Sequence, residues 1–306
     1  MTDTVPAQTQ AALDLMQLSP ARYVGQRDVT RIRAELHEGA LAIRPPGPRP
    51  DGVTFADHLI EGALPVRVYR PAALAGPPIL FLHGGGWAIC DVETHHELAC
   101  QLAADTGRLV ASVEYRLAPE HPYPAPLDDT RTAARWLASQ PGADAGIVVA
   151  GDSSGGNLAA ALALASAQDP SLPRVVLQVL LYPVLDDDLT SDTYQAFAGG
   201  RFGLSEEQMR WYWQCYAPAA GTRRDPLAVP ARAASLDGVA PAFIAVGEFD
   251  PLLSEARAYA AALRAAGVPT TLREYRGGFH GFYSFRGVLD IAADAAADVA
   301  TAITSA

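Results

Sequence analysis

One serine of this chain lies in a sequence pattern that is typical of nucleophilic catalysis. Residues 151–156 read Gly-Asp-Ser-Ser-Gly-Gly; they follow the apolar run Ile147–Ala150 and precede an alanine-rich segment, Asn157–Gln168, that predicts a helix. A G-x-S-x-G pentapeptide at a strand-to-helix turn forms a nucleophile elbow, in which a strained turn lifts the serine hydroxyl out of the sheet. The pentapeptide alone is weak evidence in a chain with 26 glycines, but its setting favours Ser153 as a nucleophile.

A second glycine-rich motif lies upstream of this serine. His83–Trp87 read His-Gly-Gly-Gly-Trp and end the apolar run Pro78–Leu82. Acyl transfer builds negative charge on the former carbonyl oxygen, and backbone N–H groups aimed at this oxygen stabilise it. Consecutive glycines let the main chain turn its N–H groups into a cleft. A phosphate loop would need a following Gly-Lys-Ser/Thr, which is absent. We therefore expect an oxyanion hole formed by the N–H groups of Gly85, Gly86 and Ser154.

The chain contains no lysine: all 23 basic residues are arginine. This excludes a Ser-x-x-Lys mechanism, a pyridoxal Schiff base and a Walker phosphate loop, since each requires a lysine. Histidine is then the first choice for the base that accepts the serine proton. His280 lies in the glycine-flanked loop 277–282, just after the predicted strand Thr271–Tyr275. The chain order Ser, Asp or Glu, His of α/β-hydrolases favours His280 as the base.

The other histidines suit this role less well; they are His37, His58, His83, His95, His96 and His121. We expect the first two at the surface and the last among prolines. His83 adjoins Gly84 in the glycine motif, where its ring is expected to brace the loop. His95 and His96 begin a predicted helix, point to different faces because they are adjacent, and so make a poor metal pair.

A carboxylate should orient the base, and it should follow the penultimate strand. The predicted strand Ala242–Gly247 is followed by Glu-Phe-Asp-Pro-Leu. Asp250 is preferred because Pro251 stiffens the turn and biases Asp250 away from helix. Glu248 stays open as the alternative, and Asp250 could also cap the helix that begins near Leu252.

These motifs together resemble the hormone-sensitive-lipase-like branch of the α/β-hydrolases, which are mostly bacterial carboxylesterases. The resemblance covers the chain from about Val53 onward. In the elbow, Ser154 replaces an alanine of the similar subgroup, and we expect little effect because this residue contributes its N–H. The segments that carry the resemblance are His83–Trp87, Glu114–Asp129, Gly151–Gly156, Asp250–Leu252 and His280–Phe282.

The resemblance implies a serine carboxylesterase that hydrolyses short- to medium-chain esters through an acyl-enzyme, with Ser153, His280 and Asp250 as the triad. It implies a small-molecule ester substrate, no cofactor and no metal. Family members often dimerise through the last strand and the C-terminal helix, so a homodimer is expected through this edge, with Val288–Ile303.

Two other functions are compatible with parts of this pattern. Plant gibberellin receptors resemble the same branch and keep the Gly-Asp-Ser elbow, but they lose the histidine base, whereas His280 is present here. An amidase or peptidase would use the same triad on a different substrate. The residues alone leave the acyl group, the alcohol and amide cleavage open.

Composition fits one α/β domain in a chain of 306 residues with 49% apolar residues. No run approaches the ~20 apolar residues of a membrane span. Met1–Thr4 lack the features of a signal peptide, and the odd set of three cysteines favours a reducing cytoplasm. The formal charge of −11 argues against nucleic acid as a partner.

The alternation of elements predicts an α/β-hydrolase fold, with a mostly parallel eight-stranded sheet flanked by helices. A catalytic core is expected at about 50–184 and 239–306, and a helical cap at about 1–45 and 185–238. Helix-start residues at Ser205–Gln208 support helix in the second cap segment. The predicted strands lie near 53–60, 64–70, 78–83, 109–115, 146–151, 175–182, 241–247 and 270–276.

Aromatic residues near the expected cap could line a substrate pocket. The candidates are Trp87 in the glycine motif and Phe202, Trp211, Tyr212 and Trp213 in the second cap segment. Simple packing of cap against core is the alternative for at least half of such residues.

Overall fold

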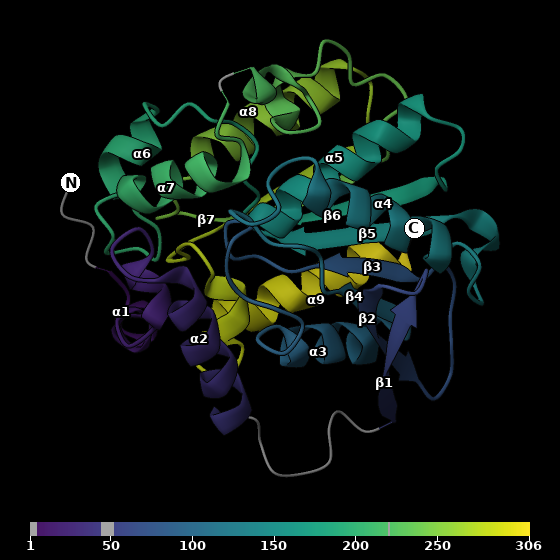
Figure 1. Ribbon diagram of the computed structural model, residues 1–306, viewed down its shortest axis with the longest axis horizontal. Helices are drawn as coiled ribbons and strands as arrows, with labels where there is room; N and C mark the ends of the chain where they lie inside the picture. Colours follow the sequence, from purple (N-terminus) through teal and green to yellow (C-terminus); the bar gives the residue numbers. More distant parts are fainter. Residues whose placement is uncertain (1–4, 44–51, 220) are drawn as a thin grey trace.

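A twisted eight-stranded sheet forms the centre of the molecule (Figure 1). The computed structural model describes residues 5–43, 52–219 and 221–306. The strand order is β1-β2-β4-β3-β5-β6-β7-β8, and β2 runs antiparallel to β1 and β4 while the remaining neighbours are parallel. The strands are β1 (Val53–Ile60), β2 (Leu64–Pro71), β3 (Ile79–Leu82), β4 (Val110–Val113), β5 (Ile147–Asp152), β6 (Val175–Leu181), β7 (Ala242–Gly247) and β8 (Thr270–Tyr275).

Helices cover both faces of this sheet. In Figure 1, α3 and α9 lie below the sheet, and α4, α5 and α8 lie above it. The α-helices are α1 (Ala7–Met16), α2 (Val29–Ile43), α3 (His96–Thr106), α4 (Ala125–Leu137), α5 (Ser154–Gln168), α6 (Asp192–Phe197), α7 (Glu206–Tyr216), α8 (Leu253–Ala265) and α9 (Asp290–Thr304). Short 3-10 helices are η1 (Pro20–Tyr23), η2 (Ala143–Ala145), η3 (Thr222–Arg224), η4 (Pro230–Arg232) and η5 (Phe282–Phe285).

Burial along the strands explains why these sequences form this sheet. Every residue of β3, β4, β5 and β7 is buried, as expected for parallel strands covered on both faces. The edge strand β8 has only Tyr275 buried. The prediction of a mostly parallel eight-stranded sheet is confirmed, and each predicted strand ends within two residues of an observed one. The ends of the central parallel strands carry the site described below.

Two helical segments that are distant in sequence lie side by side at one end of the molecule (Figure 1). The N-terminal segment carries α1 and α2, and the insertion between β6 and β7 carries α6 and α7. Gln208 Nε2 donates to the Ala21 carbonyl at 3.2 Å, which joins the two segments. Ser205 and Gln208 form a capping box at the start of α7, so the predicted helix start is confirmed.

The prediction on Met1–Thr4 and the predicted end of the first cap segment near residue 45 fall outside the described residues. Among the residues that the structure describes, no helix has both the length and the apolar character needed to cross a membrane.

Candidate active site

The strand β5 and the helix α5 meet at Ser153 in a tight turn. Ser153 has φ 52° and ψ −116°, a conformation that non-glycine residues adopt only under strain. The turn also packs closely against β3, because a Cβ on Gly155 would collide with the Leu82 carbonyl oxygen. The predicted elbow therefore places Ser153 beside the point where the glycine motif leaves β3.

Two loops at the ends of β7 and β8 bring an imidazole and a carboxylate to this serine. Ser153 Oγ lies 3.0 Å from His280 Nε2. On the other side of the ring, His280 Nδ1 lies 3.1 Å and 3.2 Å from the two carboxylate oxygens of Asp250. Asp250 is fully buried, and its Oδ1 also accepts from the Leu252 N–H at 2.9 Å. Asp250 therefore contacts the imidazole ring and the N–H group at the start of α8 at the same time.

The rival carboxylate, Glu248, faces elsewhere. Its Oε2 accepts a hydrogen bond from the Gly277 N–H at 2.8 Å. Glu248 therefore fastens the loop that carries His280 to the end of β7, whereas Asp250 contacts the ring itself.

The insertion between β6 and β7 holds the backbone of His280. The His280 N–H donates to the Phe202 carbonyl at 3.1 Å. Gly203 has φ +91°, and a Cβ there would meet the His280 carbonyl oxygen and the Met16 side chain of α1. Tyr182 packs edge-on against the imidazole, with ring centroids 5.1 Å apart. These contacts fix the ring from several elements at once.

The glycine motif forms a tight turn next to the elbow. The Gly85 carbonyl accepts from the N–H groups of Ala88 at 3.1 Å and Ile89 at 2.9 Å. Within the described residues, the N–H groups of Gly85 and Gly86 donate to no acceptor. Ser154 is the first residue of α5, so its N–H has no partner within the helix either. Three N–H groups that have no acceptor within the described part of the chain therefore lie on the two backbone segments that meet at Ser153.

Comparison with known proteins places this arrangement in a family. A family model described as alpha/beta hydrolase fold matches residues 79–284. The chain belongs to the α/β-hydrolase family. It is 39% identical over 286 residues to carboxylic ester hydrolase LipN of Mycobacterium tuberculosis, covering 87% of this chain and 75% of LipN. It is 38% identical over 275 residues to an ethyl acetate hydrolase of Pseudomonas putida, covering 86% of each.

Solved structures give the same result. A thermostable esterase from Pseudomonas putida ECU1011 superposes with a TM-score of 0.87 at 30% identity, covering 100% of this chain and 98% of that one. The resemblance to the hormone-sensitive-lipase-like branch and the prediction of a carboxylic ester hydrolase are confirmed by these comparisons.

In this α/β-hydrolase the glycine motif, residues 83–87, forms a loop, called the glycine loop below, and the His83 side chain supports it. Its ring stacks on Tyr115 with centroids 4.2 Å apart, and its Nδ1 donates to the Gly84 carbonyl at 2.8 Å. Burial lowers the pKa of His83 to about 4, with a further contribution from His95. The ring is thus neutral near pH 7, and it lies against the loop as expected.

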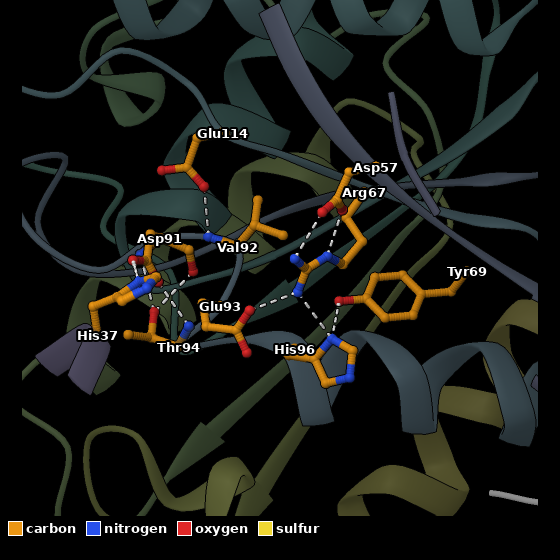
Figure 2. Close-up of polar contacts among 10 residues, drawn as sticks. All are labelled: His37, Asp57, Arg67, Tyr69, Asp91, Val92, Glu93, Thr94, His96 and Glu114. Atoms are coloured by element: carbon orange, nitrogen blue, oxygen red, sulfur yellow. Dashed lines mark hydrogen bonds and ion pairs between the residues drawn. The ribbon is translucent and has the colours of Figure 1, made fainter. Parts of the chain in front are cut away.

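The other histidines occupy separate environments. Figure 2 shows that His96 Nδ1 faces Tyr69 Oη at 3.0 Å and Arg67 Nη1 at 3.2 Å. His95 points instead to Asp152, with 3.4 Å between Nε2 and Oδ1. His37, at the surface, pairs with Asp91 at the 2.5 Å contact drawn in the same figure. The expected divergence of His95 and His96 is confirmed, and no metal-type cluster of three ligands occurs among the described residues.

Two polar contacts beside Ser153 were not predicted from the sequence. Asp152 Oδ1 accepts from the Gly84 N–H at 2.8 Å, and Ser154 Oγ accepts from the Trp87 N–H at 3.1 Å. We expected little effect of Ser154 in place of alanine because the backbone N–H is the same in both residues. Its hydroxyl in fact binds the glycine loop, and the only available signal was its departure from the alanine of the similar subgroup.

The predicted pocket aromatics have different surroundings. Trp87 is fully buried and stacks on Tyr216, with ring centroids 4.1 Å apart and planes 4° apart, so it packs the insertion against the core. Phe202 stacks on Phe249 at 5.0 Å. Trp211 lies against Gly25 of the N-terminal segment. Tyr212 adjoins Gly86, since a Cβ on this glycine would collide with its ring.

Proposed function

We propose that this protein is a serine carboxylesterase with Ser153 as nucleophile, His280 as general base and Asp250 as the group that orients His280. The observation that carries the proposal is the continuous line from Ser153 Oγ through the imidazole to the Asp250 carboxylate. The unpaired N–H groups of Gly85 and Gly86 beside it support an oxyanion hole. Ester hydrolysis as the reaction class follows from the relatives named above.

The geometry fits a two-stage reaction. His280 Nε2 accepts the Ser153 proton while Oγ bonds to the ester carbonyl carbon. The carbonyl oxygen becomes negative and is stabilised by the N–H groups of Gly85, Gly86 and Ser154. His280 then gives its proton to the departing alcohol, which leaves an acyl-enzyme. Water then attacks the acyl carbon while the same ring takes a proton from it. The ring gives this proton to Ser153 Oγ as the acyl–oxygen bond breaks, which releases the acid and regenerates the serine. The Asp250 carboxylate stabilises the imidazolium and keeps Nδ1 protonated.

We infer that the two adjoining helical segments form a cap over a catalytic core. The cap comprises about 1–45 and 185–238, of which residues 1–4, 44–45 and 220 lie outside the described residues, and the core comprises about 50–184 and 239–306. The contact of Tyr212 with Gly86 and of Phe202 with His280 supports a cap that shapes the substrate site. Resemblance to family members with compact caps favours short- to medium-chain acyl groups, with Phe202 and Tyr212 as the best pocket candidates.

We also propose a homodimer and a cytoplasmic location. The strand β8 lies at the edge of the sheet, and its outer side pairs with no strand among the described residues. Such an edge can pair with a second copy. A mass measured by light scattering tests this: a dimer is expected, and a monomer at micromolar concentration would contradict it.

One kinetic series tests the enzymatic proposal. Aryl esters of increasing acyl length should be hydrolysed fastest at short to medium length, and a matched aryl amide measures amidase activity in the same assay. A receptor would hydrolyse none of them, but the 3.0 Å contact between Ser153 and His280 favours the enzyme.

A labelling experiment tests the nucleophile. Ser153→Ala should abolish ester hydrolysis with the fold intact, and an organophosphate should label Ser153 alone. Label on the neighbouring Ser154, or near-normal turnover of the alanine variant, would show that the assignment is wrong.

A further inference from the structure

The two residues that flank Ser153 both hold the glycine loop through their side chains. Asp152 accepts from the Gly84 N–H at 2.8 Å, and Ser154 Oγ accepts from the Trp87 N–H at 3.1 Å. These two N–H groups bracket the ones assigned to the oxyanion hole, which belong to Gly85 and Gly86. Hydrogen bonds to the elbow side chains therefore hold the loop just before and just after the N–H groups of Gly85 and Gly86.

The loop needs such support because its backbone is strained. Gly85, Gly86 and Trp87 have φ values of 108°, 60° and 58°. The first two are glycines, which tolerate this region, but Trp87 is not, and a side chain there has a steric cost. The Trp87 N–H belongs to the peptide group that follows Gly86. Holding that N–H fixes the ψ angle of Gly86 and with it the direction of the adjacent donors.

Ser154 is itself held in place. Its side chain is fully buried. Burial raises the pKa of the neighbouring Tyr115 hydroxyl well above its usual value, and the nearby Ser154 hydroxyl partly opposes that rise. Tyr115 Oη donates in turn to the His83 carbonyl at 2.8 Å. Ser154 and Tyr115 thus connect the two ends of the glycine loop, from His83 to Trp87.

We propose that Ser154 is a positioning residue that acts through its side chain, separately from the N–H that it contributes to the oxyanion hole. Its hydroxyl holds the Trp87 peptide group and so fixes the spacing between the loop donors of the hole and the elbow donor. This inference rests on the proposed esterase function. It assigns a role to the hydroxyl in place of the alanine methyl of the similar subgroup.

The test compares Ser154→Ala with Ser166→Ala. Both serines lie on α5, and the Ser166 hydroxyl donates to the Pro173 carbonyl at 2.7 Å, far from the loop in sequence. Alanine adds no atoms and is the best helix former, so both variants should fold. Ser154→Ala should lower kcat for an aryl ester about fivefold, or ~1 kcal/mol at 1.36 kcal/mol per tenfold, with KM within about twofold. Ser166→Ala should leave both unchanged.

A transition-state analogue gives a second readout that a merely structural role would not move. A trifluoromethyl ketone adds to Ser153 Oγ, and its carbonyl oxygen becomes an oxyanion in the hole. Its affinity should fall about fivefold in Ser154→Ala, in parallel with kcat. Because Tyr115 and Ser154 act on the same loop, Tyr115→Phe combined with Ser154→Ala should lower kcat by less than the product of the single effects.

The outcomes are distinguishable. If the wild-type protein hydrolyses esters but Ser154→Ala keeps wild-type kcat and ketone affinity, this inference is wrong while the esterase proposal stands. A change in KM alone would also refute a positioning role. If the wild-type protein hydrolyses no ester, the proposed function itself fails.

Discussion

The two sides of Ser153 are built in opposite ways. On one side lie the side chains of His280 and Asp250, the proposed base and its orienting group, which are held mainly by backbone groups. The Phe202 carbonyl accepts from the His280 N–H, and the Leu252 N–H donates to Asp250. On the other side, the proposed oxyanion donors are backbone N–H groups, and side chains of Asp152 and Ser154 hold the adjacent N–H groups of Gly84 and Trp87. The first side depends on the identity of two residues. The second depends on the shape of a loop.

The glycine loop is also connected to more distant parts of the molecule. Arg33 of α2 donates from Nε to the Ala88 carbonyl at 2.7 Å and from Nη2 to the Ala118 carbonyl at 2.8 Å, and it forms a bidentate pair with Glu120. The Ala118 N–H donates to the Trp87 carbonyl at 2.8 Å. A helix of the N-terminal segment therefore ties the end of the glycine loop to a second loop. We therefore expect substitutions on the side of the glycine loop to lower the rate of ester hydrolysis by graded amounts. Substitution of His280 or Asp250 should abolish it almost completely.

The largest effect is expected from Asp250→Asn. An amide can hold the ring only in the unproductive tautomer, so kcat should fall about 10⁴-fold. Glu248→Gln is the matched control, since Glu248 contacts the Gly277 N–H and not the ring, and it should cost less than about tenfold. Steady-state kinetics on one aryl ester measures both. The reverse ranking would show that the orienting carboxylate has been chosen wrongly.

A smaller loss is expected from Gly86→Ala. The new Cβ would collide with the Tyr212 ring at a φ of +60°, so the loop must shift and misdirect a donor. Loss of one oxyanion donor typically lowers kcat about 10²-fold or more. Gly199→Ala is the control, because a Cβ there meets nothing within 4 Å and φ is not in the left-handed region. Equal kinetics of the two variants would contradict the assignment of Gly86 to the hole.

Arg33→Gln should have a still smaller effect. It removes the charged donor that spans the Ala88 and Ala118 carbonyls, and kcat/KM should fall roughly tenfold, the size expected for loss of hydrogen bonds from a charged group. The control is Arg31→Gln on the same helix. Arg31 is 72% exposed and pairs only with Glu35 among the described residues, and such surface pairs contribute little. If both variants behave alike, α2 does not support the loop.

The smallest effect concerns the charge pair behind the loop. Burial favours the neutral His95 ring, but Asp152 outweighs burial and raises the pKa of His95. Burial likewise disfavours the Asp152 carboxylate, yet His95 and the Gly84 N–H hold its pKa below its usual value. The contribution of His95 to stability is fully present below the ordinary histidine pKa of ~6.5 and is lost as pH rises through the folded value. That of Asp152 is lost only in acid, below its ordinary pKa of ~3.9.

The measurement for this pair is urea unfolding of the wild-type protein and of His95→Gln between pH 5 and 9. The wild-type advantage in free energy of unfolding should be largest near pH 5–6 and shrink toward pH 9, by on the order of 1 kcal/mol. An advantage that stays constant across this range would mean that His95 carries no charge in the folded protein.

Much of this architecture could be predicted from the sequence because its signals are local. Strands buried on both faces are short apolar runs bounded by turn residues, and the eight predicted strands match those observed. The glycines in residues 151–156 and 83–87 themselves indicate the tight turns that the elbow and the glycine motif form. The order of Ser153, Asp250 and His280 along the chain then selected residues that the fold brings together.

Other features depend on contacts that leave no local trace. Arg33 reaches Ala118 across 85 positions of sequence, and nothing around either residue indicates the partner. An aromatic residue such as Trp87 can line a pocket or pack between segments. The stacked Tyr216 ring shows that Trp87 packs against the insertion. The Ser154 hydroxyl was overlooked for the same reason, since its partner lies 67 positions away.

The insertion between β6 and β7 contacts both sides of the site at once. Its Tyr212 ring covers Gly86, and its Phe202 carbonyl accepts from the His280 N–H. If an ester enters by displacing this segment, the proposed oxyanion donor Gly86 and the proposed base His280 both lose a contact that holds them. We then expect turnover only after the segment has returned, so that Ser153 would react with an enclosed ester and not while the site is open.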